Sequence, residues 1–217
     1  MLENGIKDTT PAEVRAIVEA KLGPAMRAYA VELAGELLSE ASVSAIIEFS
    51  WFNPGAGRRE RGVFKVMKPH VPAYYAEDLR LLQDLAEHLA SRSRVYGFAS
   101  REVVETLDEV RMLLESEVDF RREQATLAEI GRVYRWDGAH APRPIPELCA
   151  DTITAMTVER GVKVTDAMRR HPFWRRRVAA RIVESLVAAP IFSASEDAVF
   201  HADPHAGNIL YDERANK

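Results

Sequence analysis

A change of hydrophobic period near residue 40 constrains the fold of this chain more than any other feature of its sequence. Residues 11–22 and 25–37 carry apolar side chains at helical spacing, which predicts two helices, the first ended by a Gly-Pro pair. Residues 41–51 and 61–67 are instead rich in β-branched and apolar side chains, and a polar turn at 53–57 separates them. The sequence therefore predicts two helices followed by a β-hairpin.

The remainder of the chain is largely helical. Apolar spacing predicts four further helices, over residues 73–94, 100–134, 164–170 and 173–191. We expect the longest of them to be broken once. A proline-rich connector precedes a strand over 151–159, and a polar loop leads into the short apolar run 209–211. This order predicts an α+β fold with a boundary between two lobes near residues 157–163.

The composition is that of an ordinary globular domain. Hydrophobic residues make up 47% of the chain and charged residues 29%, so we expect a packed core. The net charge of −4 gives no basic footprint and argues against a nucleic-acid partner. The single cysteine, Cys149, excludes an intrachain disulfide and fits a reducing, cytoplasmic compartment, where we expect a small buried residue. No apolar run approaches the ~18–20 residues that cross a bilayer.

The polar loop 201–208 carries the strongest chemical signal in the sequence. Asp203 and Asn208 are spaced as in phosphotransferases, where the aspartate positions an attacking hydroxyl and the asparagine binds a magnesium ion that bridges nucleotide phosphates. His201 would orient this loop through its ring hydrogen bonds. Two alternatives remain, a transition-metal pair formed by His201 and His205, and a capped turn without chemistry.

A single cation lies inside an apolar strand. Phe64 and Val66 share one face of the strand, and Lys65 points to the other face with Val63 and Met67. A lysine in such surroundings needs an anionic partner. It would bind nucleotide phosphates with a helix glutamate beside it. Alternatively, it protects the edge of a sheet from aggregation.

A cluster of carboxylates on the longest predicted helix supplies candidate partners. Asp119 and Glu123 are four residues apart and share one helix face, whereas Glu117 and Asp119 diverge by about 200°. Arg121 and Arg122 could neutralise the cluster, which leaves a solvated charged face as the alternative. A strand lysine, an acidic helix and a His-x-Asp-x-x-x-x-Asn loop follow one another in kinase-type phosphotransferases. This shared order favours phosphotransfer.

Four segments resemble the UbiB/AarF-type atypical kinases, the coenzyme-Q-supporting kinase-like proteins, and the resemblance extends over about residues 12–212. EVDFRREQA (117–125) is similar to the acidic signature of that family, and HADPHAGNIL (201–210) to its catalytic loop. GVFKVMKP (62–69) resembles the strand with the nucleotide lysine, and EASVSA (40–45) resembles the alanine-rich loop that replaces a glycine-rich loop.

The resemblance implies a role for each matching residue. Lys65 is implied to bind phosphates and Glu123 to be its helix partner, while Glu117 and Asp119 form an inhibitory or selectivity-setting acidic pair. The catalytic loop is implied to supply a catalytic aspartate, an orienting histidine and a metal ligand, namely Asp203, His201 and Asn208.

Further contacts to the nucleotide are implied at the hinge and in the alanine-rich loop. Met156 and Glu159 would lie against adenine, and Ala41, Ser42 and Ser44 would approach the phosphates. The cofactors would be ATP or ADP and Mg²⁺. The partners would be lipid-pathway proteins or a membrane, contacted through regions outside this stretch, and an oligomer is compatible with the sequence.

The implied fold is protein-kinase-like. A small N-lobe with an antiparallel sheet and long helices would occupy residues 1–160, and an incomplete helical C-lobe residues 161–217. The sequence also departs from the family. The Lys-x-Gly-Gln motif and the metal-binding Asp-Phe-Gly motif are absent, and Ala206 replaces a usual proline. We therefore expect a truncated, inactive stretch in which apolar faces of 173–191 are exposed and favour self-association.

Three functions remain open at this point. The first is an ATP-binding atypical kinase or ATPase that supports isoprenoid-quinone (ubiquinone) lipid metabolism. The second is a small-molecule phosphotransferase of the aminoglycoside or choline kinase type, because such enzymes share a similar histidine-bearing loop. The third is a non-catalytic pseudokinase remnant. The segment 117–125 favours the first, and the substrate stays open in every case.

Overall fold

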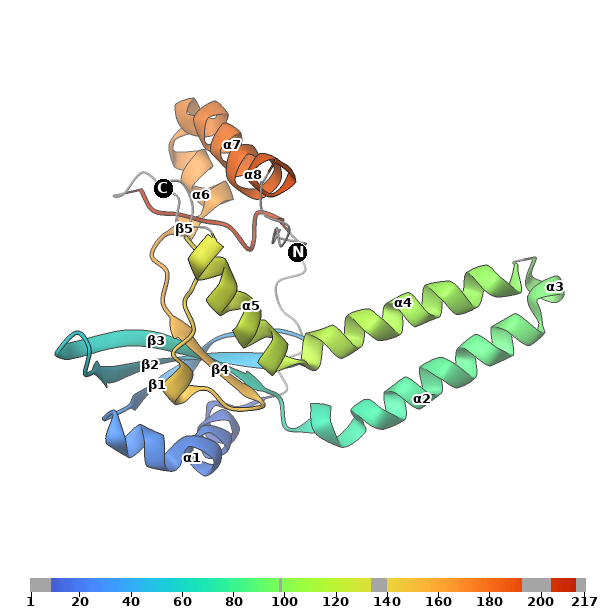
Figure 1. Ribbon diagram of the computed structural model, residues 1–217, viewed down its shortest axis with the longest axis horizontal. Helices are drawn as coiled ribbons and strands as arrows, with labels where there is room; N and C mark the ends of the chain where they lie inside the picture. The colour runs from blue at the N-terminus through green and yellow to red at the C-terminus, as the bar shows by residue number, and fades with distance from the viewer. Residues whose placement is uncertain (1–8, 98, 134–139, 193–203, 214–217) are drawn as a thin grey trace. The chain divides into compact units, whose positions relative to one another are not determined.

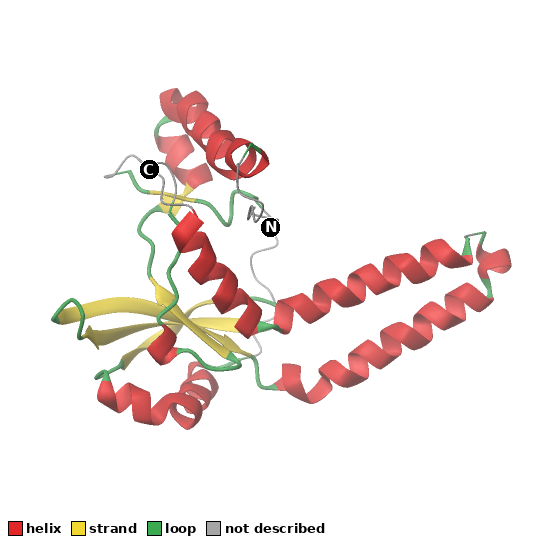
Figure 2. Ribbon diagram, in the orientation of Figure 1, coloured by secondary structure: helices red, strands yellow, loops and turns green. Residues whose placement is uncertain are grey.

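The computed structural model describes residues 9–97, 99–133, 140–192 and 204–213. The chain forms an α+β structure whose elements are drawn in Figures 1 and 2. It divides into two compact units. The first contains Met1–Gln124 and Pro144–Met156, and the second contains Ala125–Arg143 and Thr157–Lys217. That these units correspond to kinase lobes with a boundary at residue 160 stays a prediction.

Helix α1 (Pro11–Ala28) opens the first unit and begins where the sequence indicates. The Thr10 side chain accepts a hydrogen bond from the Glu13 amide, and the Glu13 carboxylate accepts one from the Thr10 amide. The expected end at residue 22 is wrong, because the helix continues through Pro24 to Ala28. A proline removes one backbone hydrogen bond, and the packing of the next turn against the core compensates for this loss.

Strand β1 (Glu32–Glu40) lies where the sequence predicted a helix over 25–37, and that prediction is wrong. The strand pairs antiparallel with β2 (Ser44–Asn53), and its register shifts on either side of Leu37. These irregularities leave its partly buried positions at 33, 34, 37 and 40, a spacing of three to four residues. The apolar pattern therefore looked helical although the backbone is extended.

The predicted β-hairpin is confirmed. Strand β2 pairs in continuous register with β3 (Arg58–Met67), from Asn53 opposite Arg58 to Ser44 opposite Met67. The Asn53 side chain accepts a hydrogen bond from the Gly55 amide and so closes the turn. With β4 (Ile153–Thr157) the strands form a sheet in the order β1-β2-β3-β4. Because β3 is an inner strand, Lys65 does not protect a sheet edge.

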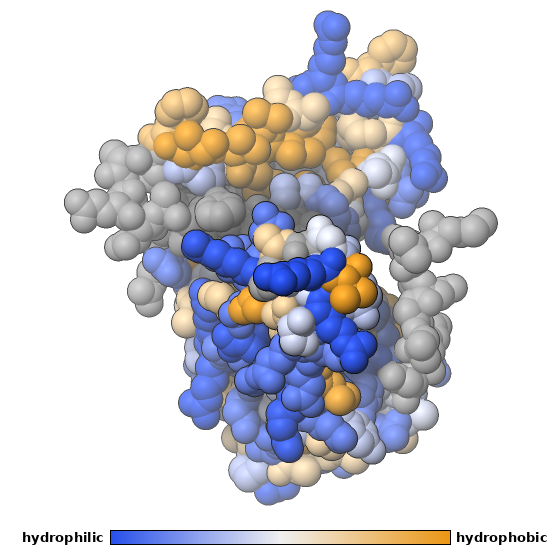
Figure 3. Space-filling model, turned by 90° about the vertical axis from the view of Figure 1, so that its right-hand side faces the viewer, coloured by the Kyte–Doolittle hydropathy of each residue, from blue (hydrophilic) through white to orange (hydrophobic). Residues whose placement is uncertain are grey.

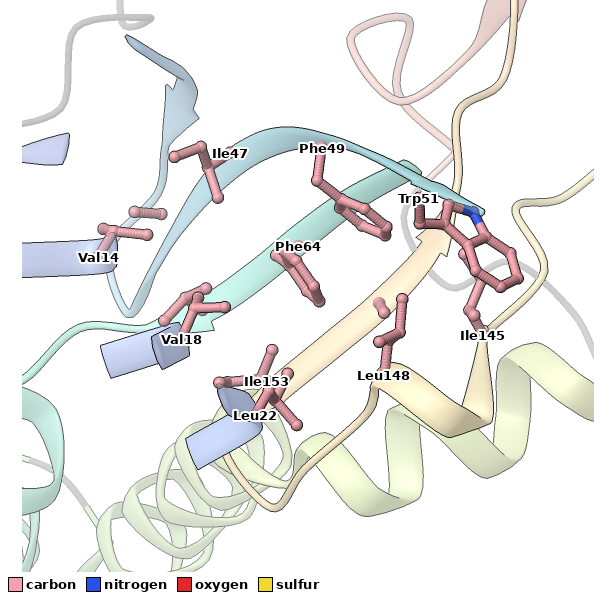
Figure 4. Packing of buried hydrophobic residues seen from close by; sticks show 13 residues of the cluster. Val14, Val18, Leu22, Ile47, Phe49, Trp51, Phe64, Ile145, Leu148 and Ile153 are labelled. Atoms are coloured by element: carbon pink, nitrogen blue, oxygen red, sulfur yellow. The ribbon is translucent and has the colours of Figure 1, made fainter. Parts of the chain in front are cut away.

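One face of this sheet is buried under α1. Side chains of the helix pack against apolar residues of β2, β3 and β4, as Figure 4 shows for Val14, Val18, Leu22, Ile47, Phe49, Phe64 and Ile153. The rings of Phe49 and Phe64 stack with their centroids 4.0 Å apart. Each such side chain contributes about 1.5–3 kcal/mol when buried. This core fixes the sheet, and it leaves the opposite face of β3 for Lys65.

Long helices follow the hairpin, as predicted. Helices α2 (His70–Ser91) and α4 (Ser100–Val118) lie side by side as an antiparallel pair, with the single turn α3 (Ser93–Tyr96) between them (Figure 1). The expected break comes at Asp119, after which α5 (Phe120–Val133) begins. A short 3₁₀ turn, Pro146–Leu148, precedes β4.

The second unit is built on helices and a two-stranded sheet. Strand β5 (Val162–Lys163) pairs with β6 (Leu210–Tyr211), and α6 (Val164–Arg170) follows β5. The predicted helix over 173–191 is a 3₁₀ turn, α7 (Arg175–Val183), a π-helical turn and α8 (Ala189–Ile191) in succession. Apolar side chains gather over α7 and α8 (Figure 3), and four are exposed, namely Val183, Val187, Ile191 and Phe192.

Candidate functional site

The structure brings Lys65 and Glu123 together in the first unit. The Lys65 Nζ lies 2.5 Å from Glu123 Oε1, and the two side chains are 23% and 31% exposed. The ammonium also lies 5.0 Å from the centre of the Phe120 ring. Phe64 and Val66 point into the core on the other side of β3, so the strand alternation expected from the sequence is confirmed. The role of the pair in nucleotide binding stays a prediction.

The helix break at Asp119 explains how Glu123 reaches the sheet. The Asp119 carboxylate accepts a hydrogen bond of 2.9 Å from the Arg122 amide, which caps the start of α5. Phe120 follows, is 1% exposed, and packs with Met67 and Val71. One turn later Glu123 therefore faces β3.

Glu117 and Asp119 do not lie on one continuous helix, contrary to the sequence prediction. Glu117 lies in the last turn of α4, and Asp119 lies between the helices, so the two are not placed about 200° apart on one helix. Both side chains are exposed. The capping side chain of Asp119 favours the break over a continuous helix. An inhibitory or selectivity-setting role of Glu117 and Asp119 stays a prediction.

Two polar residues that the sequence reasoning missed complete the surroundings of Glu123. Thr154 Oγ1 donates a hydrogen bond of 3.2 Å to Glu123 Oε2. The Gln124 side-chain nitrogen lies 2.9 Å from Ala150 O, 3.1 Å from Ile153 O and 3.3 Å from Thr154 Oγ1. A threonine inside an apolar strand, and a glutamine beside the helix glutamate, were the signals that could have identified them.

The alanine-rich loop is a tight connection between β1 and β2. The Ala41 amide donates to the Ser44 carbonyl at 2.8 Å, and the Lys68 amide donates to the Val43 carbonyl at 3.0 Å. Ala41 and Ser42 are exposed, whereas Ser44 is 1% exposed at the start of β2. Of the three residues expected near phosphates, Ala41 and Ser42 therefore have accessible side chains.

The expected hinge residues belong to different units. Met156 lies near the end of β4 in the first unit, and Glu159 lies in the second unit. The Thr157 hydroxyl donates to Glu159 Oε1 at 3.3 Å. Contact of Met156 and Glu159 with adenine stays a prediction.

A cavity of about 540 Å³ lies within the second unit. Its lining includes charged and polar side chains from three stretches of the chain, namely Glu159, Arg181, Ser185, Asn208 and Asp212. Apolar side chains such as Val158, Val178 and Leu210 form much of the remaining wall. This size and this mixture of side chains are typical of small-molecule sites.

Part of the catalytic-loop motif is described. His205 Nδ1 accepts a hydrogen bond from the Gly207 amide, and the Asn208 amide donates to the His205 carbonyl at 3.0 Å. The Val164 amide donates to the Ile209 carbonyl and ties this turn to α6. His201 and Asp203 lie outside the described residues, so their roles in the catalytic loop stay predictions. Within the described ranges, no group of three metal-ligating side chains is found.

Cys149 is half-buried beside the core of the first unit. Its thiol lies 3.4 Å from Ile145 O and 3.5 Å from Ala155 O. Burial raises the pKa of this thiol.

Across the part of the chain that the structure describes, no helix is both long and apolar enough to cross a membrane.

Comparison with known proteins identifies the family. Residues 1–216 match the ABC1 atypical kinase-like domain. The chain is 25% identical over 216 residues to the protein ACTIVITY OF BC1 COMPLEX KINASE 7, chloroplastic, of Arabidopsis thaliana. The alignment covers 97% of this chain and 29% of that protein.

Bacterial relatives match the chain at similar levels of sequence identity. The chain is 28% identical over 214 residues to the probable protein kinase UbiB of Shewanella loihica, with 97% of this chain and 37% of that protein covered. It is 29% identical over 221 residues to the probable protein kinase UbiB of Xanthomonas axonopodis pv. citri, and that alignment covers 98% of this chain and 38% of the relative. The chain therefore spans well under half the length of these relatives. Because the family match covers nearly the whole chain, this protein belongs to the ABC1 atypical kinase-like domain family.

Proposed function

We propose that this chain is the nucleotide-binding part of an atypical kinase or ATPase, in which Lys65 binds the phosphates of ATP or ADP. The observation that carries the proposal is the contact of 2.5 Å between Lys65 and Glu123, which joins β3 to a helix 58 residues later. In kinase-type phosphotransferases a strand lysine held by a helix glutamate binds phosphate oxygens.

The surroundings of the ammonium support this role. A lysine has three N–H donors, of which the Glu123 carboxylate accepts one. The Phe120 ring covers another side of the cation. The Lys65 side chain is 23% exposed, and the pair is therefore open to a phosphate oxygen from solvent.

Oxygen ligands in the second unit suit a magnesium ion. Asn208 and Asp212 line the same cavity, and an amide oxygen and a carboxylate are ligands that this hard cation accepts. We propose Asn208 as a ligand and Asp203 as the residue that positions the attacking hydroxyl. A bound magnesium ion would neutralise charge on the phosphates.

The metabolic role is also a proposal. The resemblance to UbiB/AarF-type kinases implies support of isoprenoid-quinone lipid metabolism, with lipid-pathway proteins or a membrane as partners. The names of the matched bacterial relatives describe probable protein kinases. Since the chain covers 37–38% of those relatives, their complete activity comes to this chain only as an expectation.

A thermal-shift experiment tests nucleotide binding. ATP or ADP with Mg²⁺, at about 100 times its dissociation constant, should stabilise the chain by about 2.7 kcal/mol. Lys65→Met should abolish this shift. Lys21→Met is the matched control, because Lys21 also forms an ion pair, with Asp151 on the first unit. Equal shifts for wild type and Lys65→Met would contradict the proposal.

Turnover then separates the remaining functions. Phosphorylation of an aminoglycoside or of choline would favour the small-molecule phosphotransferase. Nucleotide binding without ATP hydrolysis or phosphate transfer would fit both the non-catalytic module and the inactive atypical-kinase stretch expected from the sequence. ATP hydrolysis that Lys65→Met abolishes, without phosphorylation of those small molecules, would support the atypical kinase or ATPase.

A further inference from the structure

We propose that Gln124 and Thr154 form a hydrogen-bond relay that orients the Glu123 carboxylate toward Lys65. Thr154 is thereby a positioning residue of the proposed nucleotide site. The functional consequence rests on the proposed nucleotide binding, whereas the relay itself is a property of the protein without ligand. All four residues belong to the first unit.

The direction of each hydrogen bond in the relay follows from its chemistry. The Gln124 nitrogen faces two backbone carbonyls, Ala150 O at 2.9 Å and Ile153 O at 3.1 Å. Carbonyls only accept, so the amide group facing them must be the nitrogen and not the oxygen. The same nitrogen lies 3.3 Å from Thr154 Oγ1. Its two protons serve three acceptors, so one N–H is shared between a carbonyl and the hydroxyl, which accepts the longest of the three hydrogen bonds.

The hydroxyl proton is then directed to the glutamate. A threonine hydroxyl has one proton, and the acceptor that remains for it is Glu123 Oε2 at 3.2 Å. The other carboxylate oxygen, Oε1, contacts Lys65 Nζ at 2.5 Å. Each oxygen of Glu123 thus has its own donor, and the two donors together define the plane of the carboxylate.

The burial of Thr154 shows that its hydroxyl is present for bonding and not for solvation. Thr154 is 0% exposed, between Ile153 and Ala155, which are also 0% exposed. A valine has nearly the same shape and would pack there without a polar atom. A buried hydroxyl is costly unless it is hydrogen-bonded. Its partners in this structure are Gln124 and Glu123.

The relay matters because the ion pair by itself is weak. The side chains of Lys65 and Glu123 are 23% and 31% exposed, and ion pairs near solvent contribute little and hold their geometry poorly. A second donor, fixed on a strand of the sheet, restricts the rotation of the Glu123 carboxylate. Lys65 is then held in one position before a phosphate arrives, so binding requires less ordering.

Replacement of the hydroxyl tests the relay directly. Thr154→Val should release Glu123 and raise the rate at which Lys65 reacts with acetic anhydride by about fivefold or more, measured by peptide mass spectrometry. The dissociation constant for ATP with Mg²⁺ should rise about tenfold, the size expected for a hydrogen bond to a charged group. Thr154→Ser keeps the hydroxyl and should restore both values. Gln124→Met removes the first donor and should act in the same direction as Thr154→Val.

The chain offers a matched control two residues away. The Thr152 hydroxyl is buried without a hydrogen-bond partner among the described residues, so Thr152→Val removes the same atom without breaking a relay. It should leave Lys65 labelling and ATP affinity unchanged. The acetylation of Lys21 in each sample is an internal reference, and circular dichroism verifies that each variant is folded.

The outcomes separate the relay from the proposed function. Unchanged Lys65 labelling in folded Thr154→Val and Gln124→Met would overturn the relay. If Thr154→Val does not fold, labelling in Gln124→Met decides. If labelling changes as expected and the wild type binds no nucleotide, the relay stands and the nucleotide-binding proposal is wrong. If Thr154→Ser fails to restore labelling, the effect of Thr154→Val is one of packing, and the relay is again overturned.

Discussion

Replacement of Gly62 by alanine probes the packing that joins β3 to its neighbours. Gly62 lies directly opposite Phe49 in the ladder between β2 and β3. A methyl group there would come within 2.4 Å of Phe49 Cζ, 2.8 Å of Phe49 Cε1 and 3.0 Å of the Met156 carbonyl oxygen. The absence of a side chain at Gly62 thus makes room for the Phe49 ring.

The free-energy cost of Gly62→Ala can be estimated from these contacts. Carbon atoms pack best at about 3.5–4.0 Å, so the ring has to move by about 1 Å. It cannot move freely, because the Phe64 ring stacks on it at 4.0 Å. Overpacking of this kind costs about 1–3 kcal/mol. Alanine also restricts the unfolded chain and recovers about 0.4–1 kcal/mol. We expect Gly62→Ala to destabilise the protein by about 1–2 kcal/mol.

Gly35→Ala is the control for this experiment. Gly35 also lies in a strand, β1, and an added methyl group meets no atom within 4 Å. It should be neutral or stabilising by up to about 1 kcal/mol. Urea unfolding followed by circular dichroism measures both variants, and the midpoint should change at constant slope. Equal midpoints for Gly62→Ala and Gly35→Ala would refute the packing argument.

Three further predictions concern single contacts. Thr10→Ala removes the capping box with Glu13 and should cost about 1 kcal/mol in urea unfolding; hydrogen exchange in the first turn of α1 should accelerate. The hydrogen bond from Lys21 lowers the pKa of Asp151. The stabilisation is therefore present above the unfolded pKa and is lost as the pH falls through the folded pKa. The free energy of unfolding should therefore fall less between pH 5 and 3 in Lys21→Met than in the wild type. The difference should be below about 1 kcal/mol, because the pair is exposed. Burial raises the pKa of Cys149, so its reaction with an aromatic disulfide reagent near neutral pH should be slow in the folded protein and fast in urea. A rate equal to that of the unfolded chain would contradict this account.

The sequence and the structure agree best where a pattern is short and repeats regularly. The hairpin around Asn53 and the opposite orientations of Lys65 and Phe64 follow from alternation along a strand. The start of α1 follows from Thr10 and Glu13, whose hydrogen bonds are local. In each case the interacting residues are neighbours in the chain.

Agreement fails where a distant segment decides the outcome. The apolar spacing around Leu37 indicated a helix, but pairing with β2 makes this segment a strand. The helix was expected to end before Pro24, but packing of the next turn on the core extends it. Propensity and period are weak preferences that tertiary contacts override.

By itself, the sequence determined the start of α1, the hairpin and the face on which Lys65 lies, because these depend on the geometry of a few successive residues. Only the tertiary structure decided that β1 is a strand, that Glu123 meets Lys65 across 58 residues, and that Thr154 lies within hydrogen-bond distance of Glu123. The spacing of apolar residues indicates which face of a helix or strand is buried, but it does not indicate which distant polar atom will form a hydrogen bond on that element.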